Sequence, residues 1–253
     1  MKKQQKQTKP FRFYRYLLRL VYIKMTVKGI ENLPDEPAII VGNHSQMHGP
    51  IACELYLNDN FYTWCAGQMM KLKEVPAYAY SDFWSQKPKS VRWLFKIASY
   101  IIAPLASYIL THARTIPVYR DNRYLSTCRK TIEKLKEGTS VIIFPEHDKK
   151  HNNIVYDFQD GFIDIARLYY KKTGKELSFV PLYIAPNLEK MYFGKPVRFS
   201  SNAPIEDERR RICDYLMKEI SDIAYSLPLH TVVPYRNIRK KDYPTNVPKE
   251  EIQ

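Results

Sequence analysis

Cysteine is scarce in this sequence, and its spacing excludes two classes of small protein. Only four cysteines occur in 253 residues, and no two of them form a Cys-x-x-Cys pair. A zinc ribbon needs such pairs, and a disulfide-stabilised secreted domain needs a denser framework. We therefore expect a reduced, cytosolic environment for the four thiols, which are Cys53, Cys65, Cys128 and Cys213.

Long uninterrupted apolar runs are also missing. Arginines break every apolar stretch near the start of the sequence, so a cleaved signal peptide is not expected. The longest uncharged stretch, residues 97–111, is short for a membrane span and has Pro104 in its middle. It predicts a buried core helix or a re-entrant, interfacial segment rather than a full crossing.

Acidic residues are outnumbered by basic ones. The chain has 26 Asp and Glu against 40 Lys and Arg, a formal net charge of +14, which indicates an anionic partner such as nucleic acid, a membrane surface or a phosphorylated substrate. Residues 11–23 place Arg12, Arg15 and Arg19 on one stripe of a helix whose other positions are mostly aromatic or aliphatic. We expect residues 1–26 to form a basic amphipathic segment at the interface of anionic phospholipids. The alternative is a helix packed on the domain with its arginines in water.

Strand-like and helix-like segments alternate along the rest of the chain. The strand-like runs are residues 37–42, 61–67, 115–120, 140–146 and 178–186. Helix-like runs with capping residues lie between them, which predicts an α/β fold: a single domain with a largely parallel central sheet flanked by helices. We place this domain at residues 27–230 and expect residues 231–253 to be a basic, solvated tail.

Polar residues follow the ends of three of the predicted strands. Asn43 and His44 follow the first, Arg120 ends another, and Glu146 ends a third. Residues just past the carboxyl ends of parallel strands usually line the binding site, so we expect these side chains to converge. His44 suits a general base near neutral pH, and Arg120 suits a phosphate contact. Each also has a purely structural explanation, as a loop histidine, a surface ion pair or a turn cap.

Four short motifs, taken together and in order, resemble the sequence blocks of the glycerolipid acyltransferase family, typified by 1-acylglycerol-3-phosphate acyltransferase. They are NH at 43–44, PVYR at 117–120, FPE at 144–146 and VPLYI at 180–184. The resemblance implies an enzyme of phospholipid biosynthesis, peripheral or monotopic on the cytoplasmic face of a membrane. It would move an acyl group from a thioester, on coenzyme A or acyl carrier protein, to the hydroxyl of a lysophospholipid. No metal and no bound organic cofactor is implied.

The resemblance also assigns roles to individual residues. His44 would be the base that takes the acceptor proton, and Glu146 would position the acceptor. Arg120 and Lys149 would contact its phosphate, although the family has arginine rather than lysine at the second position. The same motifs contain further candidates for substrate binding, namely Asn43, Ser45, His48, Phe144 and Pro145.

One departure from the family pattern affects the predicted mechanism. The family has an aspartate five positions after its histidine, which orients the imidazole, and this chain has Gly49 there. Loss of an orienting carboxylate can cost several orders of magnitude in rate. Asp148 or Glu146 could supply the carboxylate, His48 could take part of the role, or the chain could be an inactive lipid- or acyl-binding protein on the same fold.

Two other classes of function are compatible with parts of the sequence. A metal-dependent hydrolase could use His44, His48 and His147, because His44 and His48 share a face if they are helical. The Gly49–Pro50 pair predicts that such a helix would end at His48, which weakens this hypothesis. Basic residues mixed with 20 tyrosines are compatible with single-stranded nucleic acid, but no recognition motif is present and we expect no nucleic-acid partner.

Overall fold

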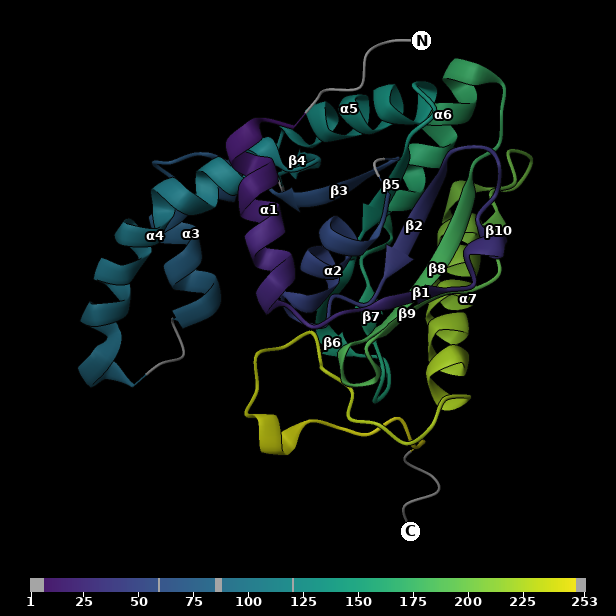
Figure 1. Ribbon diagram of the computed structural model, residues 1–253. Coiled ribbons are helices and arrows are strands. Elements are labelled where there is room, and N and C mark those ends of the chain that lie inside the picture. The colour runs from purple at the N-terminus through teal and green to yellow at the C-terminus, as the bar shows by residue number, and fades with distance from the viewer. Residues whose placement is uncertain (1–6, 59, 85–87, 120, 249–253) are drawn as a thin grey trace.

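The computed structural model describes residues 7–58, 60–84, 88–119 and 121–248, which form an α/β fold (Figure 1). The strands are β1 (Thr26–Lys28), β2 (Ala38–Gly42), β3 (Phe61–Ala66), β4 (Thr115–Val118), β5 (Ser140–Ile143), β6 (Glu146–Lys150), β7 (Tyr156–Phe158), β8 (Ser178–Ala185), β9 (Lys190–Phe193) and β10 (Val197–Arg198). The α-helices are α1 (Lys9–Val21), α2 (His48–Tyr56), α3 (Val75–Ala79), α4 (Arg92–His112), α5 (Tyr124–Lys136), α6 (Asp164–Thr173) and α7 (Ile205–Tyr225).

The central sheet is mostly parallel, as the sequence predicts. Within the described residues its strand order is β1-β9-β8-β2-β5-β3-β4, with β10 also paired to β8. The five pairs β1–β9, β8–β2, β2–β5, β5–β3 and β3–β4 are parallel. The pairs of β8 with β9 and with β10 are antiparallel. The five strand-like runs of the sequence correspond to β2, β3, β4, β5 and β8.

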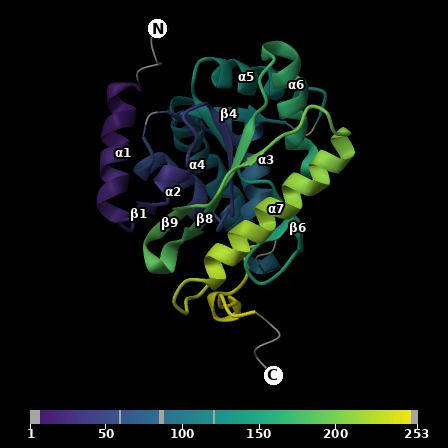
Figure 2. The ribbon, with the colours of Figure 1, turned by 90° about the vertical axis from the view of Figure 1, so that its right-hand side faces the viewer.

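Strand β2 lies in the middle of this sheet and is buried on both faces. Ile39 and Val41 contact the core beneath α5, α6 and α7, whereas Ala38 and Ile40 contact the opposite core, which includes α2. Figure 2 shows these helices on the two sides of the sheet. Burial on both faces explains why β2 is a continuous apolar run. It also makes the end of β2 a fixed point from which the next loop starts.

Helix α1 exposes several of its large apolar residues, although Phe11 is buried. Arg15 lies 3.6 Å from a carboxylate oxygen of Glu54 on α2, and the Arg19 guanidinium lies over the ring of Tyr56. Arg15 and Arg19 therefore contact α2, whereas Arg12 is exposed. The large side chains exposed on α1 are Phe13, Tyr16, Leu17, Leu20 and Val21.

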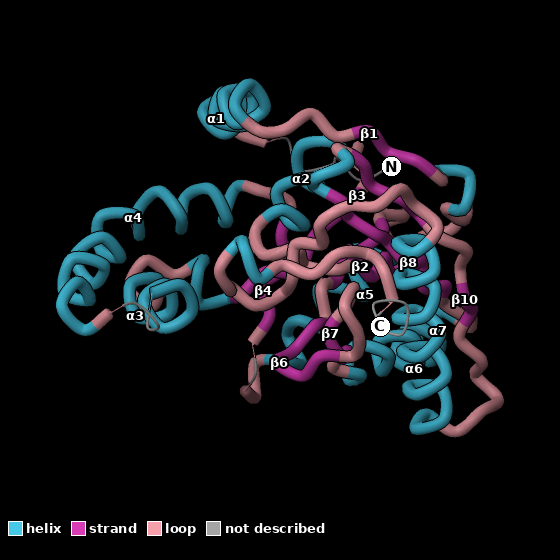
Figure 3. Tube along the Cα trace, turned by 90° about the horizontal axis from the view of Figure 1, so that it is seen from below, coloured by secondary structure: helices cyan, strands magenta, loops and turns pink. Residues whose placement is uncertain are grey.

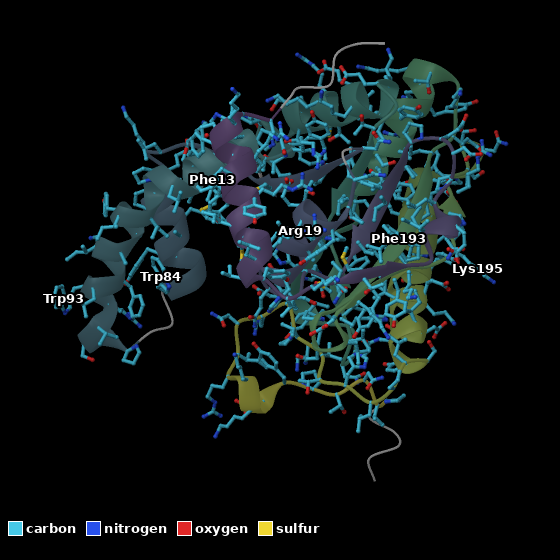
Figure 4. All side chains as sticks on the ribbon, viewed as in Figure 1. Phe13, Arg19, Trp84, Trp93, Phe193 and Lys195 are labelled. Atoms are coloured by element: carbon cyan, nitrogen blue, oxygen red, sulfur yellow. The ribbon has the colours of Figure 1, made fainter. Side chains whose placement is uncertain are left out.

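Helices α3 and α4 pack on one another and project from the body of the molecule (Figures 1 and 3). Within the part of the chain that the structure describes, residues 89–112 form the one helix long and apolar enough to cross a membrane, and little of it is buried. It continues through Pro104. The expectation of a buried core helix at 97–111 is therefore wrong. Trp93 lies at the outer end of the projection (Figure 4), and the other large exposed side chains are Leu94, Ile97, Tyr100, Ile101, Ile102 and Leu105.

Two further elements differ from the sequence-based expectations. The predicted strand 140–146 ends at Ile143, and Glu146 instead begins the small β6–β7 hairpin. The C-terminal segment, residues 226–248, is not a solvated tail. His230, Val232 and Asn246 are buried, and Thr231 pairs with Thr245, so the segment packs against the domain below α7 (Figure 1).

Candidate active site

The candidate site begins where β2 ends, and Asn43 fixes that end to the neighbouring strand. Its side-chain oxygen accepts the backbone N–H of Ile184 on β8 at 2.7 Å, and its amide nitrogen donates to the carbonyl of the same residue at 3.0 Å. The amide also donates to the Ser45 hydroxyl at 2.8 Å. Asn43 and Ser45 are both buried, so their polar groups hold the loop in place. This differs from the direct contact with substrate that the motif implies for them.

The loop after His44 has an unusual backbone. Ser45 and Gln46 both have left-handed conformations, with φ of 46° and 54°. Residues with a Cβ rarely adopt this region, and they persist there only when their surroundings hold them. The turn is closed by the backbone bonds from His48 N to Ser45 O and from Gly49 N to His44 O, each 3.0 Å. It leads directly into α2, which begins at His48, so the prediction that a helix would end there is wrong.

The His44 ring is fixed by a backbone carbonyl. Its Nδ1 is hydrogen-bonded to the carbonyl oxygen of Gln46, and its ring lies 5.2 Å from that of Phe144 and 5.8 Å from that of Tyr235. A carbonyl oxygen can only accept, so Nδ1 must carry the proton. In the neutral ring, Nε2 then holds the lone pair that a general base needs.

Glu146 supports the same residue from below. Its carboxylate is buried and accepts the backbone N–H of His44 at 2.5 Å and that of Tyr156 at 2.9 Å. Burial raises the pKa of Glu146 to about 7, and the two N–H bonds partly oppose this shift. Glu146 therefore connects the His44 loop to the β6–β7 hairpin. This contact is with the protein backbone, whereas the motif implies a contact with the acceptor.

Gly49 has no room for a side chain. A Cβ built there would lie 2.6 Å from the carbonyl oxygen of His44 and 2.9 Å from the Phe144 ring. Real Cβ atoms do not approach backbone this closely, so the aspartate of the family pattern would need the loop to move. Glycine fits this position because the loop packs closely against its Cα.

The residues expected from the third motif point to other partners. Asp148 pairs with Arg236 at 3.3 Å, and its side chain is 79% exposed. Lys149 pairs with Asp157 at 2.9 Å. The orienting partner of His44 in this structure is thus the Gln46 carbonyl and not Asp148. Pro145 contributes its carbonyl, which accepts the N–H of Gln159, and Arg120 lies outside the described residues.

His48, at the start of α2, is hydrogen-bonded to Tyr22. The Tyr22 hydroxyl lies 2.8 Å from its Nδ1, and burial, followed by the charge of Lys240, lowers the pKa of its imidazole. Within the described residues, no group of three or more His, Cys, Asp or Glu side chains is arranged to hold a metal ion.

The C-terminal segment contributes residues that the sequence did not indicate. Tyr235 lies against the His44 ring and 5.7 Å from the ring of Tyr156. The side-chain amide of Gln46 donates to the carbonyl of Arg236 at 3.3 Å and to the hydroxyl of Tyr243 at 2.9 Å. These contacts join residues about 190 positions apart, and no local motif marks them.

One family model matches part of the chain, and the match agrees with the order of the motifs. Residues 76–185 match the family model described as Acyltransferase, which confirms the expected resemblance at the level of that family. The matched segment includes three of the four motifs, at 117–120, 144–146 and 180–184. It begins after His44, so the role of His44 depends on the first motif and on the geometry above.

One solved structure that the chain resembles is the crystal structure of the 1-acyl-sn-glycerophosphate (LPA) acyltransferase PlsC from Thermotoga maritima. The two chains are 20% identical and superpose with a TM-score of 0.48, over 86% of this chain and 79% of that one. No match was found among curated protein sequences.

Proposed function

We propose that this protein transfers a fatty acyl group from an acyl thioester to the hydroxyl of a lysophospholipid such as 1-acylglycerol-3-phosphate. The observation that carries the proposal is the His44 ring at the end of β2, whose Nδ1 is bonded to a carbonyl and whose Nε2 can accept a proton. The match of residues 76–185 to the Acyltransferase family model supports the reaction type, and we propose this nitrogen as the base.

The proposed step is a direct displacement at the thioester carbon. The acceptor oxygen bonds to the acyl carbon while His44 Nε2 takes the hydroxyl proton. The carbon–sulfur bond then breaks, and the proton held by His44 passes to the departing thiolate. Coenzyme A or acyl carrier protein serves as the donor substrate, and the step uses no metal or organic cofactor.

We propose that Arg120 and Lys149 bind the phosphate of the acceptor. Lys149 is engaged with Asp157, but its side chain is 79% exposed. Exposed ion pairs contribute little to stability, so Lys149 can exchange a carboxylate for a phosphate at small cost. The excess of positive charge on the chain favours the same kind of ligand.

Membrane phospholipids are the proposed surroundings of the reaction, with an anionic surface preferred and no nucleic acid involved. The apolar side chains exposed on α1 and α4 support this proposal, because large apolar patches on a soluble surface indicate contact with lipid or protein. A peripheral or monotopic position on the cytoplasmic face agrees with the reduced cysteines and the basic composition.

An acyl-transfer assay tests the proposal directly. It combines the purified protein with lysophosphatidic acid in liposomes and with either acyl-CoA or an acyl carrier protein thioester. We expect phosphatidic acid to form, the His44→Ala variant to form none, and EDTA to have no effect. No product from either donor, with lysophospholipid still bound, would instead support an inactive lipid-binding protein. Activity that survives His44→Ala but is lost with EDTA would instead support the metal-dependent hydrolase hypothesis, with His48 and His147 as candidate ligands.

A further inference from the structure

The structure contains a replacement for the carboxylate that this chain lacks. We propose that the backbone carbonyl of Gln46, held in place by the C-terminal segment, is the positioning group for His44. This inference rests on the proposed function, but it concerns a feature of the ring that can be measured without turnover.

The first step in the argument is steric. A side chain at position 49 would collide with the carbonyl of His44 and the ring of Phe144, so the loop cannot present a carboxylate from there. The same tight loop brings the Gln46 carbonyl onto Nδ1 of His44. The same loop conformation therefore leaves no room for an aspartate at position 49 and provides the Gln46 carbonyl in its place.

The second step concerns what keeps this carbonyl in position. Ser45 and Gln46 must both stay left-handed, which is unfavourable for residues with a Cβ. On one side, Asn43 and Ser45 are tied to β8, so the start of the loop is fixed. At Gln46 itself, the side chain is held by the carbonyl of Arg236 and the hydroxyl of Tyr243.

The third step is that the C-terminal segment is itself anchored well enough to hold Gln46. The buried Asn246 side chain donates to the carbonyl of Ala224 at 2.8 Å and accepts the N–H of His230 at 2.8 Å. Asn153 donates to the carbonyls of Thr245 and Val247 on the far side of the segment. The path of positioning thus runs from α7 through the C-terminal segment to Gln46 and then to His44.

A carbonyl differs from a carboxylate in one chemical respect. Both fix the Nδ1–H tautomer, but the neutral carbonyl stabilises the imidazolium less than a charged partner does. The replacement therefore preserves the orientation of the base and gives up part of the stabilisation of its protonated form.

The tautomer is the direct readout. In protein labelled with ¹⁵N-histidine, we expect neutral His44, assigned with a His44→Gln variant, to show a protonated Nδ1 and an unprotonated Nε2. His230 is an internal reference, because its Nδ1 lies 2.8 Å from the Pro228 carbonyl. A predominant Nε2–H tautomer at His44 would overturn the proposal, whether or not acyl transfer is observed.

Variants test the role of the C-terminal segment. Tyr243→Phe removes one acceptor of the Gln46 amide, and we expect kcat to fall about fivefold with KM unchanged and a mixture of His44 tautomers. Tyr215→Phe is the matched control, because the Tyr215 hydroxyl donates to the Lys195 carbonyl away from the loop. If both variants keep the parent tautomer and the parent kcat, the segment does not position His44.

Gly49→Asp tests the replacement itself. We expect this variant to lose the Nδ1–H signature and at least tenfold in kcat, because the loop can no longer close. Circular dichroism checks that the variant is folded. If Gly49→Asp does not fold, the Tyr243→Phe variant tests the proposal instead. A folded Gly49→Asp protein with kcat above the parent would show that a carboxylate fits and works better, which would overturn the proposal.

Discussion

The Glu146 carboxylate accepts the backbone N–H of His44 at 2.5 Å. The carboxylate therefore acts on the path of the backbone. Protein N–H groups bond to both of its oxygens, and the side chain is buried. This combination has consequences for both stability and activity.

Stability should depend on pH through Glu146. Its pKa is about 7 in the folded protein against 4.5 ordinarily, so between these values the folded state binds more protons than the unfolded state. The free energy of unfolding should then fall as pH rises from about 4.5 to 7, by up to about 3 kcal/mol from this group. Urea unfolding of the parent and of Glu146→Gln at several pH values measures this, and the variant should lack the decrease.

Glu208→Gln is the control for that measurement, with the opposite sign. The Glu208 carboxylate pairs with Arg211, which lowers its pKa, so it stabilises the fold above its ordinary pKa and loses this contribution as pH falls. Glu146→Gln should also be slower in acyl transfer, because an amide leaves one of the two N–H groups without an acceptor. An unchanged pH profile and unchanged kcat in Glu146→Gln would contradict this account of the residue.

Asp148→Asn separates two possible partners of His44. Asp148 is exposed and pairs with Arg236, so the substitution should change kcat by no more than about twofold, as expected for a surface ion pair. Steady-state kinetics with lysophosphatidic acid measure the effect. A loss of a hundredfold or more in a folded variant would instead establish Asp148 as the orienting carboxylate.

Asn43→Ala should destabilise the fold by about 1–3 kcal/mol, because the N–H and carbonyl of Ile184 would then be buried without partners. Chemical denaturation is the measurement. Asn187→Ala is a suitable control, since its side chain makes one exposed bond to the Thr231 carbonyl. Equal stability of the two variants would mean that water replaces the lost bonds at Ile184.

Ile101→Lys tests whether the exposed side of α4 contacts lipid. Ile101 is 73% exposed in the structure, so a lysine there should not disturb folding but should weaken flotation with anionic liposomes. Leu125→Lys is the matched control, because Leu125 is 71% exposed and lies on α5 rather than on the projecting helices. Equal flotation of both variants would remove α4 from the membrane-binding surface.

The fold could be predicted from the sequence to the extent that its signals are local. The apolar runs that became β2, β5 and β8 are buried on both faces, and such strands are recognisable from composition alone. His44 was found because it follows a strand within a known motif. In each case a few adjacent residues carry the information.

The parts that could not be predicted depend on contacts between distant residues or on the backbone. The orienting group of His44 is a backbone carbonyl. Because every residue has one, no residue type in the sequence indicates it. Arg15 and Arg19 of α1 contact Glu54 and Tyr56 on α2, and helical periodicity does not reveal these contacts. Tyr235 and Tyr243 reach the site through the path of the C-terminal segment, which only the folded structure shows.

The pairing of Asn43 with Ile184 makes the asparagine a surrogate for a peptide group. Its side chain supplies one acceptor and one donor, as the next residue of β2 would have done, so the sheet is continued by a side chain while the main chain departs. Aspartate lacks the donor and leucine lacks both groups, so neither can imitate the peptide. The backbone after β2 therefore does not have to follow the hydrogen-bonding geometry of a strand. The next residues can form a turn that regular strand pairing would not allow.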